Sequence, residues 1–456
     1  MGNRRLAVLL GLALLVVIGP IVANDTAQPA SRYSLTASLA EHGSVDLAPY
    51  RDRLGVDHAL YRGEWRSDKA PGQPLLGVPA YLVGRAMGAE SAAHARVHGD
   101  LGLWWQTFWS ALVPFAALVA LMFLFATRFA RRGPALAVAL LIGVGTMMLP
   151  HGVNLYAHDL AALLGFGAWM VLEPVPISAR RAALGGLLAG AAVLTEYESG
   201  IILLALAGYL IARQRARIGA YVFATLVPIG VLAAYQWIAF GAPWHTPSSY
   251  YAGTINGTSE GGYTIPRVQE MVQVVFGYRG LVVGAPIALV GLVAAGSLAL
   301  RGESRLRNHG AVALAVFVPY LVLCAGWSGL PILEEPGPRY LIPALPFLAV
   351  PLAALWDRLW RPMLLASLVG AAIAVPTAFT FILLRIHQPP YPELLNRVRA
   401  HHFVPTLWSM GLGRFGVALY AATIVAAVSA FVRAARRAPD PDSVAEQVFA
   451  STLARR

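Results

Sequence analysis

Residues 24–76 begin with Asn24-Asp25-Thr26 and end with Ser67-Asp68-Lys69-Ala70-Pro71-Gly72-Gln73-Pro74-Leu75-Leu76, with a polar, half-amphipathic run from Ser31 to His42 between them. The stretch directly follows the apolar segment Leu6–Ala23. It gathers carboxylates, cations and aromatic side chains in a chain that is otherwise largely apolar. We therefore interpret it as a polar loop beside a membrane, and the rest of the chain can be arranged around it.

The composition identifies the class of protein. Of the 456 residues, 57% are hydrophobic and 13% are charged, whereas soluble domains carry roughly 25% charged residues. The mean hydropathy is +0.60. Apolar runs recur along the whole length, most of them long enough to cross a hydrocarbon core of roughly 30 Å. These values predict an all-α polytopic membrane protein and give no sign of a separate soluble domain.

The apolar runs predict about twelve transmembrane helices. The first is Leu6–Ala23, for which a cleaved signal peptide is the alternative. The others are Leu101–Ala126, Pro134–Leu149, Ala157–Leu172, Ala182–Leu194, Gly200–Ala212, Ile218–Phe240, Leu281–Leu300, Ala311–Trp327, Tyr340–Trp356, Met363–Leu384 and Phe415–Val432. Pro74–Met87 is apolar but too short to span, so we expect a helix at the interface or dipping into it.

Arginine clusters test this assignment, because positively charged residues mark the cytoplasmic side of a membrane protein. With alternating spans, the clusters at 128–132, 180–181, 213–217, 301–307, 358–361 and 433–437 all fall on the side of Arg4 and Arg5. The net charge of +12 is therefore explained by topology, and we expect no nucleic-acid partner. Cys324 is the single cysteine, which excludes an intrachain disulfide.

The same alternation predicts the domain organisation. A membrane domain covers residues 1–432, and a polar tail, 433–456, lies with the N-terminus in the cytoplasm. The outer face receives a long first loop, 24–76, with short interfacial helices, and further segments at 241–280 and 385–414. We expect the functional site on this outer face.

Ionisable residues at the outer ends of the predicted spans are the candidate site residues. Asp25 follows the first span, at headgroup level, where a carboxylate can take a proton from a hydroxyl; a helix cap or a solvated side chain is the alternative. Lys69 precedes the short apolar run and can meet a phosphate as a point charge, although simple snorkelling to headgroups fits equally well.

Further candidates lie at the same predicted depth. His158-Asp159 opens one span and Glu196 lies in the turn between two others, and ionisable residues at such depths tend to face a polar cavity. Arg339 in Pro338-Arg339-Tyr340-Leu341-Ile342-Pro343 can hold phosphate oxygens with two N–H groups, with Tyr340 beside it. The remaining cavity candidates are Arg32, Trp244, Tyr250 and Arg279. Trp244 and Tyr250 also suit an interfacial aromatic belt.

These motifs, in this order and on one side, resemble the GT-C superfamily of polyprenyl-phosphate-sugar-dependent glycosyltransferases, which includes protein O-mannosyltransferases and aminoarabinose transferases. The resemblance covers nearly the whole chain. Asp25 is similar to the family's first-loop aspartate, Asp68 to Leu75 to its acidic-Lys-Pro-Pro-Leu segment, and Arg339 to Pro343 to its later Arg/Lys-Tyr-x-x-Pro element. A lone Asp25 in place of an Asp-Glu pair, and Ala70-Pro71 in place of two prolines, depart from the family's pattern and leave the subfamily open.

The resemblance implies a membrane enzyme that transfers a sugar from a polyprenyl-phosphate donor to an extracytoplasmic hydroxyl of a glycan, glycolipid or protein, with inversion. It implies Asp25 as the base, Asp159 as a second acidic residue, and Lys69, Arg339 and Tyr340 at the donor phosphate. A transporter or lipid flippase is the alternative, but no internal repeat of the kind found in transporters is visible. The histidines show no compact ligand spacing, so we expect no structural metal, while a divalent metal remains compatible with the family.

Overall fold

The computed structural model describes residues 2–21, 27–94, 100–252, 264–277, 280–326, 337–380 and 413–437, and a few residues in 254–259 and 392–399. Two candidate residues, Asp25 and Arg279, lie outside the described residues. So do most of the predicted outer segment 385–414 and the tail from residue 438. The predictions that fall on them remain predictions.

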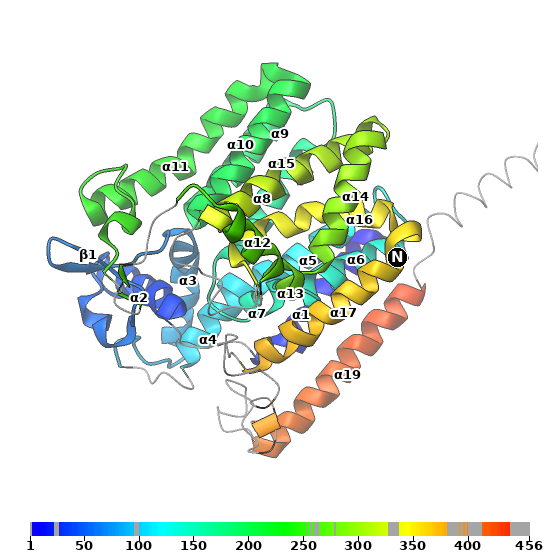
Figure 1. The fold of residues 1–456 in the computed structure, drawn as a ribbon. Helices are drawn as coiled ribbons and strands as arrows, with labels where there is room; N and C mark the ends of the chain where they lie inside the picture. Colours follow the sequence, from blue (N-terminus) through cyan, green and yellow to red (C-terminus); the bar gives the residue numbers. More distant parts are fainter. Residues whose placement is uncertain are drawn as a thin grey trace, which may run out of the picture.

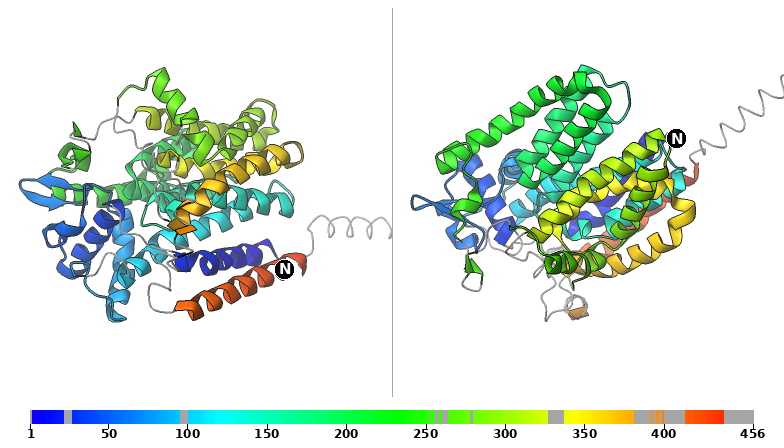
Figure 2. Two further views of the ribbon diagram at one scale, coloured as in Figure 1. Left: turned by 60° about the horizontal axis from the view of Figure 1, so that its bottom comes forward. Right: turned by 45° about the horizontal axis from the view of Figure 1, so that its top comes forward.

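The described chain is mainly helical. The bundle contains α1 (Asn3–Ile18), α4 (Leu101–Thr107), α5 (Val113–Ala126), α6 (Arg132–Val144), α7 (Met148–Gly152), α8 (His158–Leu172), α9 (Ala179–Thr195), α10 (Gly200–Gln214), α11 (Ile218–Phe240), α12 (Val268–Phe276), α13 (Leu281–Gly284), α14 (Ile287–Arg301), α15 (Ser304–Gly326), η8 (Arg339–Leu348), α16 (Ala349–Ala354), α17 (Trp356–Thr380) and α19 (Gly413–Arg437). The first loop contains α2 (Ala27–His42), η2 (Ala48–Arg53), β1 (Ala59–Tyr61), β2 (Glu64–Arg66) and α3 (Gly72–Ala86). These loop elements gather at one end of the molecule, and the N-terminus lies at the opposite end (Figures 1 and 2).

Each predicted span coincides, in its described part, with a helix or with a run of short helices. Leu101–Ala126 contains α4 and α5, and Ile218–Phe240 is α11. Within the described residues, six helices are long and apolar enough to cross a membrane, or seven if the bent pair 268–284 and 287–301 forms one span. Three shorter apolar helices accompany them. The chain is therefore a multi-pass membrane protein, while the number twelve stays a prediction.

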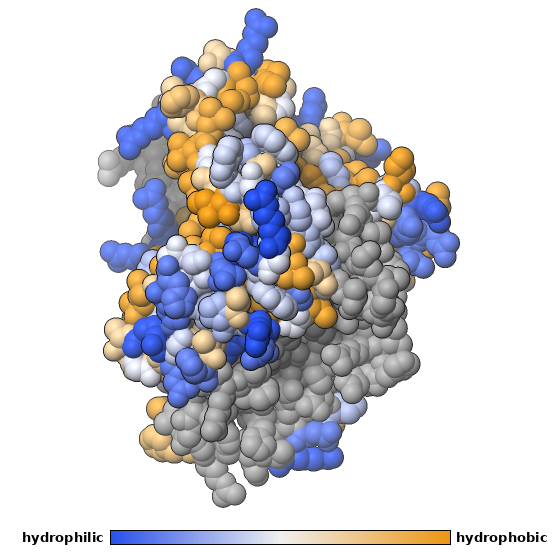
Figure 3. Space-filling model, turned by 90° about the vertical axis from the view of Figure 1, so that its left-hand side faces the viewer, coloured by the Kyte–Doolittle hydropathy of each residue, from blue (hydrophilic) through white to orange (hydrophobic). Residues whose placement is uncertain are grey.

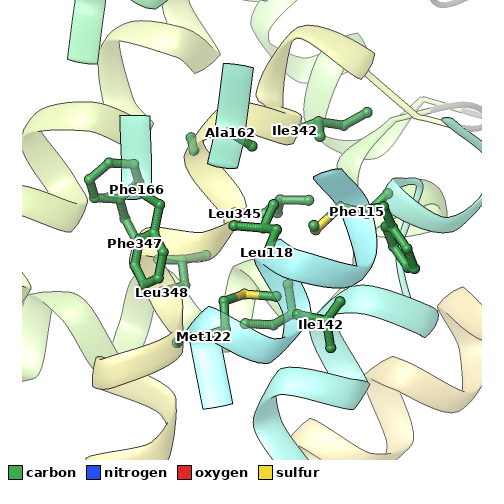
Figure 4. Packing of buried hydrophobic residues seen from close by; sticks show 14 of the residues in the cluster. Phe115, Leu118, Met122, Ile142, Ala162, Phe166, Ile342, Leu345, Phe347 and Leu348 are labelled. Atoms are coloured by element: carbon green, nitrogen blue, oxygen red, sulfur yellow. The ribbon is translucent and has the colours of Figure 1, made fainter. Parts of the chain in front are cut away.

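The core lies where α5, α6, α8 and η8 pack together (Figure 4). Phe166 of α8 meets Phe347 of η8 edge to face, with ring centroids 5.7 Å apart. Element η8 is a 3₁₀-helix and contains Pro343 and Pro346. Because proline has no backbone N–H and its ring clashes with the preceding turn, a regular α-helix is disfavoured there. Since η8 packs along α8, the first residues of both helices reach the same end of the bundle.

Small residues let α9 pack closely against α8 and α11. A Cβ on Gly185 would lie 2.7 Å from Leu172 of α8, and one on Gly186 would lie 2.0 Å from the carbonyl oxygen of Tyr221 of α11. Such close approaches are how membrane helices gain packing contacts without a hydrophobic driving force. Helix α9, whose C-terminal end carries Glu196, is thereby held between α8 and α11.

The first loop differs from expectation in two respects. It contains a two-stranded hairpin, with Ala59 opposite Arg66, in which Arg62 and Gly63 have positive φ angles of 53° and 82°. In addition, α2 is buried from Gln28 to Ser38, so it forms part of the interior rather than a surface element. Hydrophilic side chains are prominent on the middle and lower left of this end of the molecule (Figure 3).

Candidate functional site

Three cations from separate parts of the chain converge at the first-loop end of the bundle. They are Arg32 of α2, Lys69 of the loop before α3, and Arg339 at the start of η8, and we call them the basic cluster. All three lie within electrostatic range of His158, the first residue of α8. The structure thus brings together four residues that the sequence analysis selected from distant positions.

Arg32 is fully buried and paired on one side. Its Nη2 donates to Oε1 of Glu196 over 2.7 Å, and Nδ1 of His158 lies 3.6 Å from the same oxygen. The Nε and Nη1 atoms of Arg32 have no hydrogen-bond partner among the described residues. Because buried N–H groups are nearly always paired, these two donors point to a ligand that accepts hydrogen bonds.

Lys69 is held by two carboxylates. Its Nζ lies 2.6 Å from Oδ2 of Asp68 and 3.4 Å from Oδ1 of Asp57. Burial by itself would lower the pKa of Lys69, but the charges of Asp57 and Asp68 raise it above its usual value. Burial also raises the pKa of Asp57, against the opposing charge of Lys69. Lys69 is therefore a fixed positive charge at neutral pH.

Local structure explains where Lys69 lies. Arg66, the last residue of β2, donates from Nε to the carbonyl oxygen of Ala239 at the end of α11 over 3.2 Å, which anchors the hairpin. After Lys69, the chain passes Gly72, where an added Cβ would lie 2.7 Å from the carbonyl oxygen of Leu194. Only glycine permits that approach, and it brings the loop against the end of α9, next to Glu196.

Arg339 and Tyr340 also lie close to His158. The Arg339 guanidinium stacks on the Tyr340 ring at 5.2 Å, and the Tyr340 ring lies 5.7 Å from that of His158. With its amide oxygen oriented toward Arg339, Gln28 of α2 accepts hydrogen bonds of 2.6 and 3.3 Å from Nη2 and Nη1. Gln28 and Arg32 are one helical turn apart on α2, so this helix contacts two members of the site.

Asp159 follows His158 and is completely buried. Neither of its carboxylate oxygens finds a hydrogen-bond partner among the described residues, and the same holds for Nε2 of His158. A buried, unpaired carboxylate is costly. Buried ionisable groups without partners are often functional, and Asp159 follows directly after His158, which the basic cluster surrounds.

Trp244 and Tyr250, the other cavity candidates in the described part of the chain, contact aromatic rings. Trp244 is 75% exposed and meets only the ring of His245 among the described aromatic contacts. Tyr250 stacks on Phe240 at 5.4 Å and contacts Tyr61 edge to face. This second set forms an aromatic cluster that joins the hairpin to the end of α11.

Sequence reasoning missed two residues of the site. Asp57 lies just before β1, and only the path of the hairpin brings it to Lys69. Gln28 could have been found, because its spacing of four residues from Arg32 places both on one helical face. Within the part of the chain that the structure describes, no group of three or more histidine, cysteine, aspartate or glutamate residues could hold a metal ion.

Comparison with known proteins shows that the fold of this chain is similar to that of solved membrane enzymes. No family model matches the chain, and no curated protein matches its sequence. The crystal structure of ArnT from Cupriavidus metallidurans bound to undecaprenyl phosphate is similar with a TM-score of 0.51 and 15% identity, over 94% of this chain and 76% of that one. Its apo form gives 0.50 and 13%, over 92% and 74%.

A further similarity, with a TM-score of 0.49 and 12% identity, is to the archaeal oligosaccharyltransferase AglB from Archaeoglobus fulgidus, in complex with an inhibitory peptide and a dolichol-phosphate. It covers 89% of this chain and 56% of that one. At identities this low a similarity concerns architecture, and the ArnT structures carry the conclusion. The chain has a GT-C-like fold.

Proposed function

We propose that the protein is a membrane glycosyltransferase that moves a sugar from a polyprenyl-phosphate donor to the hydroxyl of an extracytoplasmic acceptor. The observation that carries this proposal is the convergence of the basic cluster beside buried carboxylates, in a chain with a GT-C-like fold. Support for the donor class comes from the similar ArnT structure, which was solved with undecaprenyl phosphate.

The basic cluster is proposed to hold the donor phosphate. When the bond between the sugar and the phosphate breaks, negative charge grows on the leaving phosphate, and fixed cations stabilise that charge. Arg32 offers two buried N–H donors, Lys69 offers a point charge, and Arg339 offers a planar guanidinium suited to phosphate oxygens. Glu196 positions Arg32 through its 2.7 Å hydrogen bond.

Asp25 is proposed as the base, with Asp159 as a second acidic group in the site. In the reaction, the acceptor hydroxyl gives its proton to the carboxylate while its oxygen bonds to the anomeric carbon of the sugar. The bond from that carbon to the phosphate oxygen breaks, and the polyprenyl phosphate leaves with the electron pair. Attack opposite the leaving group inverts the anomeric configuration.

Binding of undecaprenyl phosphate to the purified protein tests the proposed phosphate site. Native mass spectrometry in detergent should show retention of undecaprenyl phosphate but much weaker retention of undecaprenol. Arg32→Ala and Lys69→Ala should each weaken retention about ten-fold, as expected for the loss of one charge-assisted hydrogen bond. Arg51→Ala is the matched control, because Arg51 lies at the same end with 68% of its side chain exposed. Equal retention of the two lipids would exclude phosphate recognition.

Asp25→Asn separates binding from transfer. It should leave undecaprenyl phosphate retention unchanged and reduce transfer by about 10²–10⁴-fold, the usual contribution of a general base. Mass analysis of envelope glycans and lipids from a deletion strain identifies the missing product, and complementation with each variant measures its recovery. Full recovery with Asp25→Asn would remove Asp25 as the base.

A further inference from the structure

A second polar region lies at the end of the bundle opposite the candidate site. A cavity of about 450 Å³ opens there, lined by the end of α5, the start of α6, the junction of α16 and α17, and Asn3. Its charged lining residues are Arg128, Arg131, Arg132 and Asp357. Among the described residues, three cations and one carboxylate therefore line the cavity; the carboxylate is paired with Arg131 at 2.6 Å, and Arg132 donates from Nε to Oδ1 of Asn3.

The surroundings of Arg128 increase this excess of positive charge. Burial lowers the pKa of Arg128, and the neighbouring charges of Arg305, Arg181 and Arg4 lower it further, against the opposing effect of Glu173. Glu173 lies 3.8 Å from Arg128, and both of its oxygens accept hydrogen bonds from Arg305 over 2.6 and 3.1 Å. An additional anion next to Arg128 would relieve the repulsion among these arginines.

The position of the cavity identifies the kind of anion. Two helices that are candidate spans, α1 and α17, begin at the cavity, and a third, formed by α4 and α5, ends there. Residues at the ends of spans lie at the level of lipid headgroups. The same two starting helices carry exposed apolar side chains further along, namely Val8 and Leu12 on α1 and Leu365 and Leu368 on α17. A molecule with an anionic head and apolar tails fits this combination.

We propose that this cavity binds the phosphate headgroup of an anionic phospholipid from the adjoining leaflet. Arg128 and Arg132 contact the phosphate oxygens, and the acyl chains extend along the apolar surfaces of α1 or α17. Basic pockets between membrane helices are suited to such headgroups. This site is separate from the proposed donor site, because it lies at the C-terminal end of α8 whereas the basic cluster lies at the N-terminal end.

Native mass spectrometry of the full-length protein tests the proposal. Protein released from nanodiscs of equal phosphatidylglycerol and phosphatidylcholine should retain phosphatidylglycerol preferentially. Arg132→Gln should reduce that preference about ten-fold, and Asp357→Asn, which removes a carboxylate from the described lining, should increase it. Arg128→Gln should act like Arg132→Gln. Arg128→Gln also removes a neighbour of Glu173, and Arg132→Gln also removes the hydrogen bond from Arg132 Nε to Oδ1 of Asn3, so a loss of the preference in both variants is the deciding result.

Two further measurements separate binding of the lipid headgroup in this cavity from nonspecific attraction and from binding of soluble phosphate. Arg180→Ala removes an exposed arginine at the start of α9 that does not line the cavity, and it should leave the preference unchanged. An equal loss with Arg180→Ala would mean general attraction of a basic surface to anionic lipid, and would overturn the proposal. Competition by millimolar glycerol phosphate as effective as that by phosphatidylglycerol would show a site for soluble phosphate, and would also overturn it.

Discussion

The two ends of helix α8 hold buried carboxylates in opposite circumstances. At its C-terminal end, Glu173 is 4% exposed, and its two carboxylate oxygens accept hydrogen bonds from Nε and Nη2 of Arg305. His309 lies 3.6 Å and Arg128 3.8 Å from the same carboxylate. At its N-terminal end, Asp159 is fully buried, and its oxygens have no partner among the described residues.

The difference in hydrogen bonding between these two carboxylates bears on whether each contributes to stability or to function. An unsatisfied buried polar group costs about 1–3 kcal/mol, and the N-terminal end of α8 contains several such atoms, on Arg32, His158 and Asp159. A fold optimised for stability alone would pair or remove them. The C-terminal end shows that the same helix can satisfy a buried carboxylate with protein partners alone. The unpaired groups at the N-terminal end support the ligand site that we propose there.

The largest expected effect is on catalysis at the unpaired end. Asp159→Asn should reduce sugar transfer by about 10²-fold or more, because an amide cannot accept or give the proton in the reaction. The thermal unfolding temperature should stay equal or rise, because the buried group can no longer carry an unpaired charge. Transfer assays and thermal unfolding in the same detergent measure both. Full transfer activity together with a clear loss of stability would make Asp159 a structural residue and break the contrast.

The next effect is on stability at the satisfied end. Glu173→Gln leaves Arg305, His309 and Arg128 without their carboxylate, and it should lower the free energy of unfolding by about 2 kcal/mol, within the range for hydrogen bonds to charged groups. The loss is smaller than for a fully buried pair, because 57% of the Arg305 side chain is exposed. Retention of undecaprenyl phosphate by the folded variant should be unchanged. A variant that is as stable as the unmodified protein would show that the four-residue arrangement contributes nothing to stability.

The same carboxylate predicts how stability depends on pH. Burial by itself would raise the pKa of Glu173, but its interactions with His309 and Arg305 lower it to about 2. Since the folded-state pKa lies below the unfolded value of about 4.3, the unfolded state binds the proton more readily. The stabilisation from Glu173 is therefore fully present above about pH 4.3, and decreases as the pH falls toward 2. Unfolding curves of the unmodified protein and Glu173→Gln should converge over this range, and parallel curves would contradict the assignment.

The sequence allowed the helices to be predicted better than their contacts. Apolar length and flanking arginines are local signals, and they located Leu101–Ala126 and Ile218–Phe240 as the structure has them. His158 and Arg339 are predicted as site residues because they begin spans at the outer face, and Lys69 because it precedes a short apolar run. The structure brings them together with Arg32, which the sequence analysis names as a cavity candidate. Asp25, the proposed base, lies outside the described residues, so its role stays a prediction.

The sequence did not allow us to predict which charged side chains pair with one another, because tertiary structure brings them together from distant positions. Asp57 lies close to Lys69 only because the hairpin folds back. Glu173 pairs with Arg305, which lies on a helix more than a hundred residues later in the sequence. Aromatic composition also could not distinguish Tyr250, which stacks on Phe240, from a residue that stacks on a sugar. Both uses require the same flat, apolar ring.

The smallest effect concerns a charge pair that is exposed, at the end of the molecule where the candidate site lies. Asp52 is 98% exposed and 3.6 Å from Arg51, and such pairs are screened by water and salt. Asp52→Asn should therefore change neither the unfolding temperature nor undecaprenyl phosphate retention. A decrease in the unfolding temperature as large as that with Glu173→Gln, or a decrease in lipid retention as large as that with Arg32→Ala, would contradict this expectation. Either result would mean that the effect of a charge depends on its location at one end of the bundle and not on its burial and hydrogen bonding. The contrast between Asp159 and Glu173 requires the opposite result.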